Sequence, residues 1–201
     1  MNKNKSESFI YLDKINNKIC DKLIDFYESG LGTAGVAKTR GLMGNPPTYD
    51  PVFKDSEESF YTCFPIYYAK ALLEINNKFK KKFIYSDKMH CEWNIVEPIK
   101  IQKYYPGQAF KGWHYENNGS SKMGTRHLVF MTYLNDIKYG GETEWFYQKI
   151  KIKPKKGLTV IWPAQWTHTH RGLIAPKEIK YIVTGWFNYV KEGQQLITTC
   201  K

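Results

Sequence analysis

The pattern of hydrophobic and polar positions divides the 201-residue chain into a helical first part and a strand-rich second part. After a short predicted strand at residues 8–12, apolar residues recur every three or four positions through residues 13–29, which predicts an amphipathic helix. The same spacing returns at residues 64–83 and predicts a second helix. Residues 30–61 lie between them and are rich in glycine and proline, so we expect a loop or irregular strand there, the most mobile part of the chain.

From residue 91 onward the period changes to that of β-strands. Residues 149–153 alternate lysine and isoleucine, which predicts a strand with one wet face and one buried face. Apolar runs predict further strands at residues 127–134, 158–162 and 181–187. Many short strands separated by turn residues are typical of a sandwich or jelly roll. We therefore expect one mainly β domain with helices that support one side of it.

Composition adds the size of the core and the sign of the charge. Hydrophobic residues make up 42% of the chain and aromatic residues 16%, which allows a sizeable core and excludes disorder of the whole chain. The formal net charge is +11. Residues 1–88 hold 14 basic and 11 acidic side chains, a net charge of +3, which leaves +8 for the remainder. Such an excess suits a nucleic acid, an acidic peptide or a dicarboxylate cosubstrate, or else a solvated lysine-rich surface.

The number and spacing of the cysteines indicate whether the protein is expected in an oxidising or a reducing compartment. Four of them are scattered along the chain without a CxxC pair, so neither a disulfide framework nor a thiolate zinc site is expected. The N-terminus lacks the apolar core of a signal peptide, and no apolar run is as long as a membrane span. We expect reduced thiols, a cytoplasmic location and no membrane partner.

Candidate chemistry begins with His114 and Glu116. Residues two apart on a strand point to the same side, so one strand end can offer both to a metal. Two imidazoles and one carboxylate form the set that holds non-haem Fe(II) and leaves positions open. An isolated pair of this kind is more often a surface pair, and a site needs a third ligand. Four histidines are candidates for it: His90, His127, His168 and His170.

A series of short motifs follows in order. They are YYPGQ at residues 104–108, Arg126 followed by YLND at 133–136, GGET at 140–143, PKKG at 154–157, WP at 162–163 and HRG at 170–172, then Lys180 and Trp186. With these motifs, residues 103–187 resemble the prolyl 4-hydroxylase-like branch of the Fe(II)/2-oxoglutarate-dependent dioxygenases. The resemblance covers less than half of the chain but includes all the expected site motifs.

The resemblance implies a fold and a set of cofactors. The fold is a double-stranded β-helix, a jelly-roll or cupin-like core, with N-terminal α-helices. Residues 1–88 would form supporting helices and a mobile loop, residues 89–190 the core and residues 191–201 a tail, all within one domain of residues 1–201. The implied cofactors are Fe(II), O₂ and 2-oxoglutarate as cosubstrate, with ascorbate as a further candidate.

The resemblance also implies the metal ligands: His114, Glu116 and His170. His168 is the rival for the distal position, and His170 is preferred because its distances to Gly172 and Lys180 both match the family. The family's usual carboxylate is Asp, and Glu116 departs from it by one methylene. A carboxylate of that length can still reach a metal, so the departure concerns the geometry of the site rather than the type of ligand.

The cosubstrate contacts follow in the same way. Lys180 is the implied cation for the far carboxylate of 2-oxoglutarate, and Tyr133 would bond the same group. Tyr104 is the preferred second contact and Tyr105 the alternative, because neighbouring strand residues face opposite ways. Two further motif residues could either contact the cosubstrate or hold the barrel together: Arg126 and Trp186.

The expected reaction is hydroxylation of prolyl residues in a peptide or protein, with 2-oxoglutarate converted to succinate and CO₂. The loops at residues 30–61 and 117–125 would then help to cover the substrate. An oxygenase acting on a nucleic-acid base or a free amino acid is the alternative. The lysine cluster of residues 149–156 is the feature that could bind the phosphates of a nucleic acid. A non-catalytic binding module on the same fold is a third possibility. A metal-binding assay would distinguish it from an enzyme.

Overall fold

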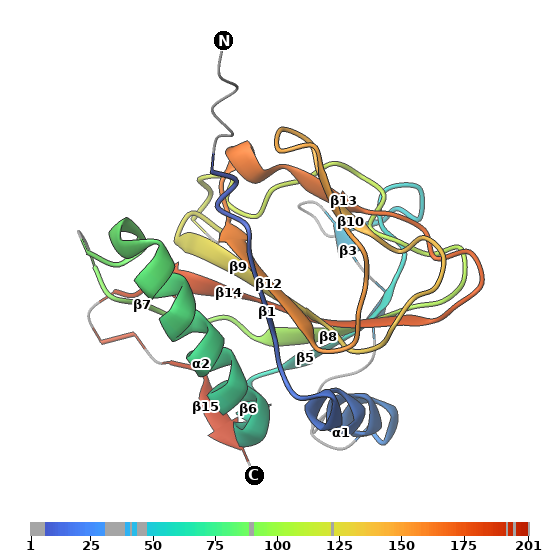
Figure 1. Cartoon of the computed structure of the whole chain (residues 1–201), viewed down its shortest axis with the longest axis horizontal. Helices are drawn as coiled ribbons and strands as arrows, with labels where there is room; N and C mark the ends of the chain where they lie inside the picture. Colours follow the sequence, from blue (N-terminus) through green and yellow to red (C-terminus); the bar gives the residue numbers. More distant parts are fainter. Residues whose placement is uncertain are drawn as a thin grey trace.

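The computed structural model describes residues 7–30, 39–40, 42–43, 48–88, 91–121, 123–191, 193–194 and 196–200. Its centre is an antiparallel eight-stranded sheet, drawn across the middle of Figure 1. The strand order is β1 (Tyr11–Lys14), β12 (Leu158–Pro163), β9 (Arg126–Tyr133), β14 (Lys180–Tyr189), β8 (Ile99–Tyr104), β5 (Glu57–Tyr61) and β2 (Thr39–Arg40), with β7 (Trp93–Asn94) also paired to β14.

A smaller sheet packs over one face of the large one. It consists of β11 (Ile150–Ile152), β10 (Thr143–Trp145) and β13 (His170–Gly172). Trp145 and Ile152 of this sheet join Val129, Met131 and Trp162 of the large sheet in one hydrophobic cluster. Two antiparallel sheets packed face to face confirm the predicted jelly-roll core.

The opposite face of the large sheet is covered by helices α1 (Asn17–Glu28) and α2 (Ile66–Lys82), seen below and to the left of the sheet in Figure 1. Asn16 caps α1, its side chain accepting from the Lys18 backbone N–H. Both helices enter a second hydrophobic cluster with the sheet. The remaining elements are η1 (Ile84–Ser86), η2 (Trp166–His168), the pair β3 (Leu42–Met43) with β4 (Thr48–Tyr49), and β15 (Thr198–Cys200) parallel to β6 (Cys63–Pro65).

Alternate residues of the central strands point to opposite faces of the large sheet. Ile99 and Ile101 of β8 and Phe130 of β9 belong to the cluster under the helices. Tyr104 of β8 and Met131 of β9 belong to the other cluster, beneath the small sheet. The two-residue period of a strand produces this division. A cavity opens on the second face, as described below.

The predicted helices and strands are largely confirmed, with two differences. The first helix begins four residues later than predicted, because Asp13 and Lys14 end strand β1. Within residues 30–61, predicted as a loop or irregular strand, β5 is a regular strand that pairs with β8 in the large sheet. Residues 31–38, 41 and 44–47 of that range lie outside the described residues.

The prediction that all cysteines are reduced is wrong for one pair. Cys63 and Cys200 form a disulfide, with Cα atoms 5.6 Å apart, although 137 residues separate them in sequence. The parallel pairing of β15 with β6 brings them together. Cys20 and Cys91 are free, the first buried and the second exposed.

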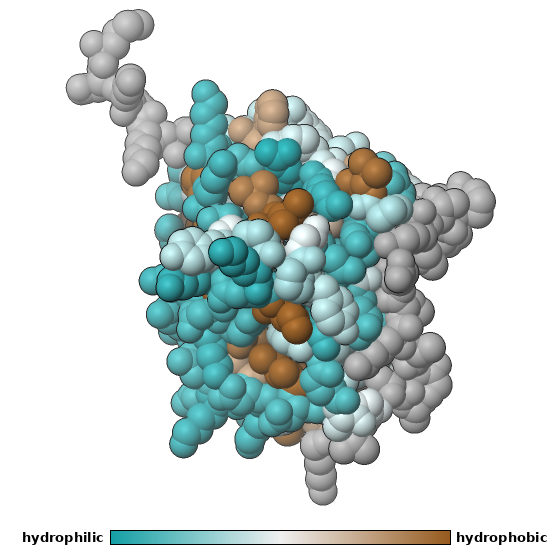
Figure 2. Space-filling view, turned by 90° about the vertical axis from the view of Figure 1, so that its right-hand side faces the viewer, coloured by the Kyte–Doolittle hydropathy of each residue, from teal (hydrophilic) through white to brown (hydrophobic). Residues whose placement is uncertain are grey.

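The surface is mainly polar on the face shown in Figure 2, where hydrophobic side chains form small separate groups. Among the described residues, no helix has the length and apolar composition that crossing a membrane requires.

Candidate active site

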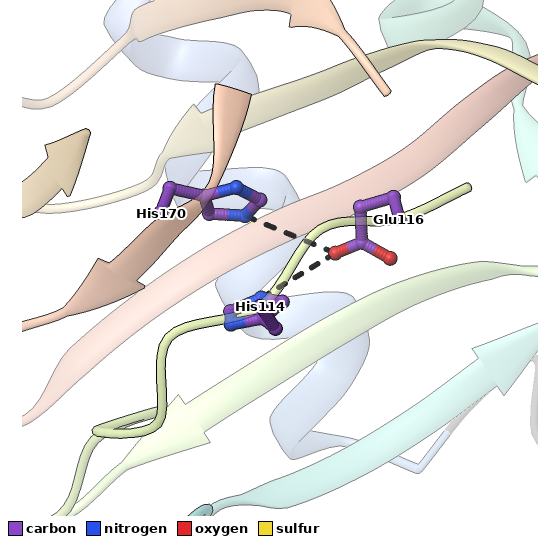
Figure 3. Close-up of side chains that lie close together, drawn as sticks. All are labelled: His114, Glu116 and His170. Atoms are coloured by element: carbon purple, nitrogen blue, oxygen red, sulfur yellow. Dashed lines mark ion pairs between the residues drawn. The ribbon is translucent and has the colours of Figure 1, made fainter. Parts of the chain in front are cut away.

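Three side chains converge beside strand β13 of the small sheet. His114 and Glu116 lie in the segment between β8 and β9, and His170 is the first residue of β13 (Figure 3). His114 and His170 face each other in an isolated antiparallel bridge, with N–H···O distances of 3.0 and 2.9 Å. One ligand atom from each residue lies within 4.8 Å of the others. The Nε2 atoms of His114 and His170 are 3.5 and 3.9 Å from Glu116 Oε1.

Both imidazoles are held in one orientation. Each Nδ1 lies 2.9 Å from a backbone carbonyl, that of Gly112 for His114 and that of His168 for His170. An Nδ1–H that donates to a carbonyl leaves the Nε2 lone pair free for a metal. Phe110 stacks on the His114 ring at 3.5 Å between centroids, and Trp162 meets the His170 ring edge-on at 5.0 Å.

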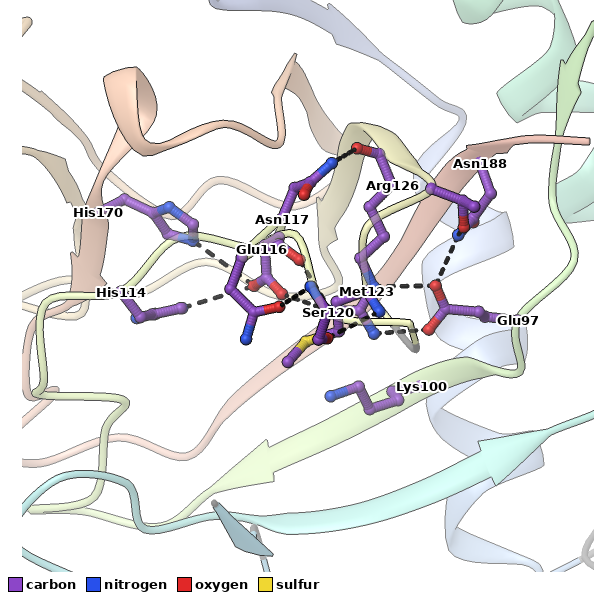
Figure 4. A network of polar contacts seen from close by, with 12 residues as sticks. Glu97, Lys100, His114, Glu116, Asn117, Ser120, Met123, Arg126, His170 and Asn188 are labelled. Atoms are coloured by element: carbon purple, nitrogen blue, oxygen red, sulfur yellow. Dashed lines mark hydrogen bonds and ion pairs between the residues drawn. The ribbon is translucent and has the colours of Figure 1, made fainter. Parts of the chain in front are cut away.

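The carboxylate of Glu116 is fixed from its other side. Arg126 Nη1 donates to Glu116 Oε2 at 3.1 Å, which leaves Oε1 directed at the two imidazoles. Arg126 also donates from Nε to Glu97 Oε1 at 2.9 Å (Figure 4). Its guanidinium lies 3.6 Å from the centre of the Trp186 ring. Arg126 therefore positions the carboxylate whose extra methylene departs from the family pattern.

The protonation states suit a metal site. Burial alone would raise the pKa of Glu116, but its neighbours His114, His170 and Arg126 hold that pKa far below its usual value. Burial, followed by the charge of His114, lowers the pKa of His170 to about 3. At neutral pH the cluster therefore offers an ionised carboxylate and a neutral imidazole, the forms that bind a metal.

Beside this cluster lies a narrow cavity of about 50 Å³, which becomes about 570 Å³ when the open space at its mouth is included. Lys180 stands at one end, 3% exposed, and donates to the Gly141 carbonyl at 3.1 Å. Its Nζ lies 4.8 Å from the centre of the Tyr104 ring. Burial lowers the pKa of Lys180 to about 8, although the charge of Glu142 acts to raise it. A buried cation of this kind suits an anionic ligand.

Two hydroxyl groups lie on the cavity wall. Tyr133 donates its O–H to Thr143 Oγ1 at 2.6 Å, so the Thr143 proton is free to be donated onward. Sequence analysis selected Tyr133 but missed Thr143, although Thr143 is the last residue of the GGET motif. The sequence signal that could have identified Thr143 is its place at the end of this motif, at the start of a strand.

The structure separates the alternatives at two positions. Tyr104 lines the cavity and is 3% exposed, whereas Tyr105 is 39% exposed and lies over Lys103. His168 points away from the cluster, with Nε2 2.9 Å from the Ser8 carbonyl. Similarly, His127 lies 3.0 Å from the Ser86 carbonyl. His90 falls outside the described residues.

At the other end of the cavity are Lys100, Gln102 and Trp186. Trp186 is a sequence candidate, and the structure places it under the guanidinium of Arg126. Lys100 and Gln102 were not predicted from the sequence, because both precede the first of the family motifs, which begins at Tyr104. Their side chains share the inward face of β8 with Tyr104, at two-residue spacing.

Comparison with known proteins bears on the same region. Residues 99–188 match the model of the 2OG-Fe(II) oxygenase superfamily. A search of curated proteins by sequence finds no match. Among solved structures, a collagen prolyl hydroxylase from Paramecium Bursaria Chlorella virus-1 is 24% identical with a TM-score of 0.62, over 91% of this chain and 97% of that one.

Two further solved structures are similar. A Pseudomonas putida prolyl-4-hydroxylase is 11% identical with a TM-score of 0.64, over 90% of this chain and 92% of that one. A Trichoplax adhaerens prolyl hydroxylase in complex with a hypoxia inducible factor peptide is 14% identical with a TM-score of 0.67, over 90% and 84%. These likenesses establish a shared fold, and together with the superfamily match they confirm the resemblance noted in the sequence.

Proposed function

We propose that this chain is an Fe(II)- and 2-oxoglutarate-dependent dioxygenase that hydroxylates prolyl residues in peptides or proteins. The observation that carries the proposal is the cluster of His114, Glu116 and His170 beside a cavity that ends in buried Lys180. The superfamily match to residues 99–188 supports the reaction class, and the similar prolyl hydroxylase structures support the substrate class.

The three clustered residues would hold the Fe(II). Two imidazole nitrogens and one carboxylate are the donor set of non-haem iron oxygenases, and the Nδ1 and Arg126 contacts orient these donors beforehand. When bound, the iron supplies the O₂ chemistry that couples decarboxylation of 2-oxoglutarate to hydroxylation of a C–H bond. The protein supplies position and charge.

Lys180 would bind the far carboxylate of 2-oxoglutarate. Its ammonium is desolvated and has only the Gly141 carbonyl beside it among the hydrogen bonds of the described residues. Tyr133 and Thr143 would add a hydroxyl donor to the same carboxylate, and Tyr104 would pack against the ligand from β8. The cosubstrate would thus reach from Lys180 to the metal cluster.

The substrate would approach from the Trp186 end of the cavity. A nucleic-acid substrate would depend on the lysines of residues 149–156, but two of these are already in ion pairs. Lys151 lies 3.2 Å from Glu144, and Lys156 pairs with Asp21. We therefore favour a peptide substrate.

The test is a screen of 2-oxoglutarate turnover with proline-containing peptides, in which succinate and the gain of one oxygen atom by the peptide are both measured. Wild-type protein should give both products in a one-to-one ratio with Fe(II) present. The His170→Ala variant should lose tight Mn(II) binding and turnover, whereas His168→Ala should keep the metal. Tight Mn(II) binding by His170→Ala would contradict the ligand assignment, and absence of any hydroxylated peptide would contradict the substrate class.

A further inference from the structure

A second lysine lines the cavity at the end opposite Lys180. In the pairing of β8 with β14, Lys180 lies opposite Tyr104 and Lys100 lies opposite Thr184. The two positions are four residues apart along the strands, about 13 Å at the rise of a β-strand. Lys180 and Lys100 therefore cannot both bind one end of the same small cosubstrate.

The ammonium of Lys100 has little to bind. Among the described residues it donates no hydrogen bond, and the nearest carboxylate oxygen, Glu58 Oε2, is 4.0 Å away. Its side chain is only 15% exposed. The rings of Trp186 and Phe60 lie 4.9 and 5.5 Å from Nζ. Figure 4 shows Lys100 on β8 below Glu116 and Arg126, without a contact drawn to it. A partly desolvated cation with weak partners costs stability, so it favours a ligand role.

The carboxylate nearest to Lys100 is already occupied. Glu58 Oε1 lies 2.6 Å from Lys54 Nζ, and the two side chains are 2% and 3% exposed. The same oxygen accepts from Ser56 Oγ at 3.0 Å and from Gln102 Nε2. One buried carboxylate therefore faces two ammonium groups, and Lys54 is the closer. Lys100 is the surplus positive charge.

The other cation near this end is also occupied. Arg126 is bound by both Glu97 and Glu116, at 2.5 and 3.1 Å. Of the basic side chains described around this end of the cavity, Lys100 is thus the one that lines the space without a close anionic partner. A single lysine between aromatic rings matches a carboxylate better than a phosphate, which takes several donors or an arginine fork.

We propose that Lys100 binds a carboxylate of the substrate and so selects acidic peptides. This inference rests on the proposed function, because it names the group that a peptide substrate would present at the Trp186 end of the cavity. The carboxylate could come from an Asp or Glu side chain near the target residue or from a free chain terminus. Both sources share the chemistry that Lys100 recognises.

The experiment measures binding without turnover, to full-length protein loaded with Mn(II) and 2-oxoglutarate. Capped peptides carry Glu, Gln or Lys at each of the two positions before and after a central proline. At one or more positions, wild-type protein should bind the Glu peptide about tenfold or more tightly than the Gln peptide. Lys100→Met should reduce that ratio to within about twofold, and Lys100→Glu should reverse it in favour of Lys peptides. The control Lys155→Met removes one exposed charge and should keep the wild-type ratio.

Uncapped peptides that end at proline, compared with their amides, distinguish a terminal carboxylate from a side chain. The inference is overturned if no carboxylate preference exists, if Lys100→Met retains it, or if Lys100→Met weakens 2-oxoglutarate binding instead. Hydroxylation is measured separately with Fe(II). Peptides that bind with the expected charge preference but gain no oxygen would contradict the proposed function and leave the assignment of Lys100 standing.

Discussion

Three lysines in and beside the cavity differ in what each ammonium has next to it. The nearest partner of Lys54 is a carboxylate at 2.6 Å, that of Lys180 is a backbone carbonyl at 3.1 Å, and that of Lys100 is a carboxylate oxygen at 4.0 Å. Burial lowers the pKa of both Lys54 and Lys180 to about 8. The same residue type therefore has a structural role at Lys54, whereas the roles proposed for Lys180 and Lys100 are to bind ligands.

The proposed role of Lys180 predicts that cosubstrate binding depends on pH. A carboxylate beside its ammonium favours the charged form, so the pKa of Lys180 rises from about 8 when 2-oxoglutarate binds. Affinity should be constant below pH 8 and should fall by up to about tenfold per pH unit above it, because binding then requires proton uptake. Calorimetric titration of 2-oxoglutarate into the Mn(II)-loaded protein from pH 7 to 9.5 measures this. Lys180→Arg stays charged and should show no such fall; an equal slope in that variant would assign the effect to another group.

Lys54 and Lys100 should differ in their effect on stability. Lys54→Met leaves Glu58 buried without its close partner, which should cost about 3–5 kcal/mol of unfolding free energy. Lys100→Met leaves the close Lys54–Glu58 pair intact. It removes a charge that lowers the pKa of Lys54 and also lowers that of Glu58, two opposed effects on stability, so the loss should be smaller than that of Lys54→Met. Urea unfolding of the two variants measures the difference. Equal losses would show that the two lysines share Glu58 equally.

Sequence reasoning located the residues whose chemistry is visible in short motifs. His114 and Glu116 were selected by type and spacing, and His170 and Lys180 were selected through the family resemblance of the motifs around them. The structure places all four around one cavity. Lys100 was missed because its meaning depends on Glu58, which lies 42 residues earlier in the chain. A pairing of that range has no local pattern.

At the scale of elements, contacts between residues far apart in sequence also explain why strand β5 was not predicted as a regular strand. Its residues Glu57, Glu58 and Ser59 lack apolar alternation, so the local pattern predicted a loop or irregular strand rather than a regular strand of the large sheet. The structure buries Glu58 through Lys54 and joins Glu57 to the Tyr27 hydroxyl at 2.7 Å. Helix α2 was predicted well because its apolar stripe is continuous in sequence and packs directly on the sheet.

The disulfide gives a prediction at this scale. The Cys63–Cys200 bond closes a loop between residues 137 apart, so Cys200→Ser should lower the unfolding free energy by about 2–4 kcal/mol. Urea unfolding with and without dithiothreitol measures it: reductant should destabilise wild-type protein by a similar amount and leave the variant unchanged. Cys91→Ser changes an exposed free cysteine and should keep the sensitivity to reductant. Wild-type protein that is insensitive to reductant would contradict the prediction.

At the scale of the whole molecule, the large sheet separates two environments. The helices α1 and α2 lie on one side, and the small sheet lies on the other (Figure 1). The cavity is on the side of the small sheet. The strand order that produces this arrangement joins segments from both ends of the chain, since β1 pairs with β12 and β5 pairs with β8. Hydrophobic patterning predicted the layers, whereas the pairing order required the structure.

The two-sided sheet limits how the chain can change in length. Along β14, Lys180 and Ile182 face the cavity while Val183 belongs to the core under the helices. Deleting one residue within β14 would exchange these sets and place an ammonium among helix side chains. Length changes in this chain should therefore be confined to the segments between strands, because a change of length within β14 alters the helix-side core and the lining of the cavity together.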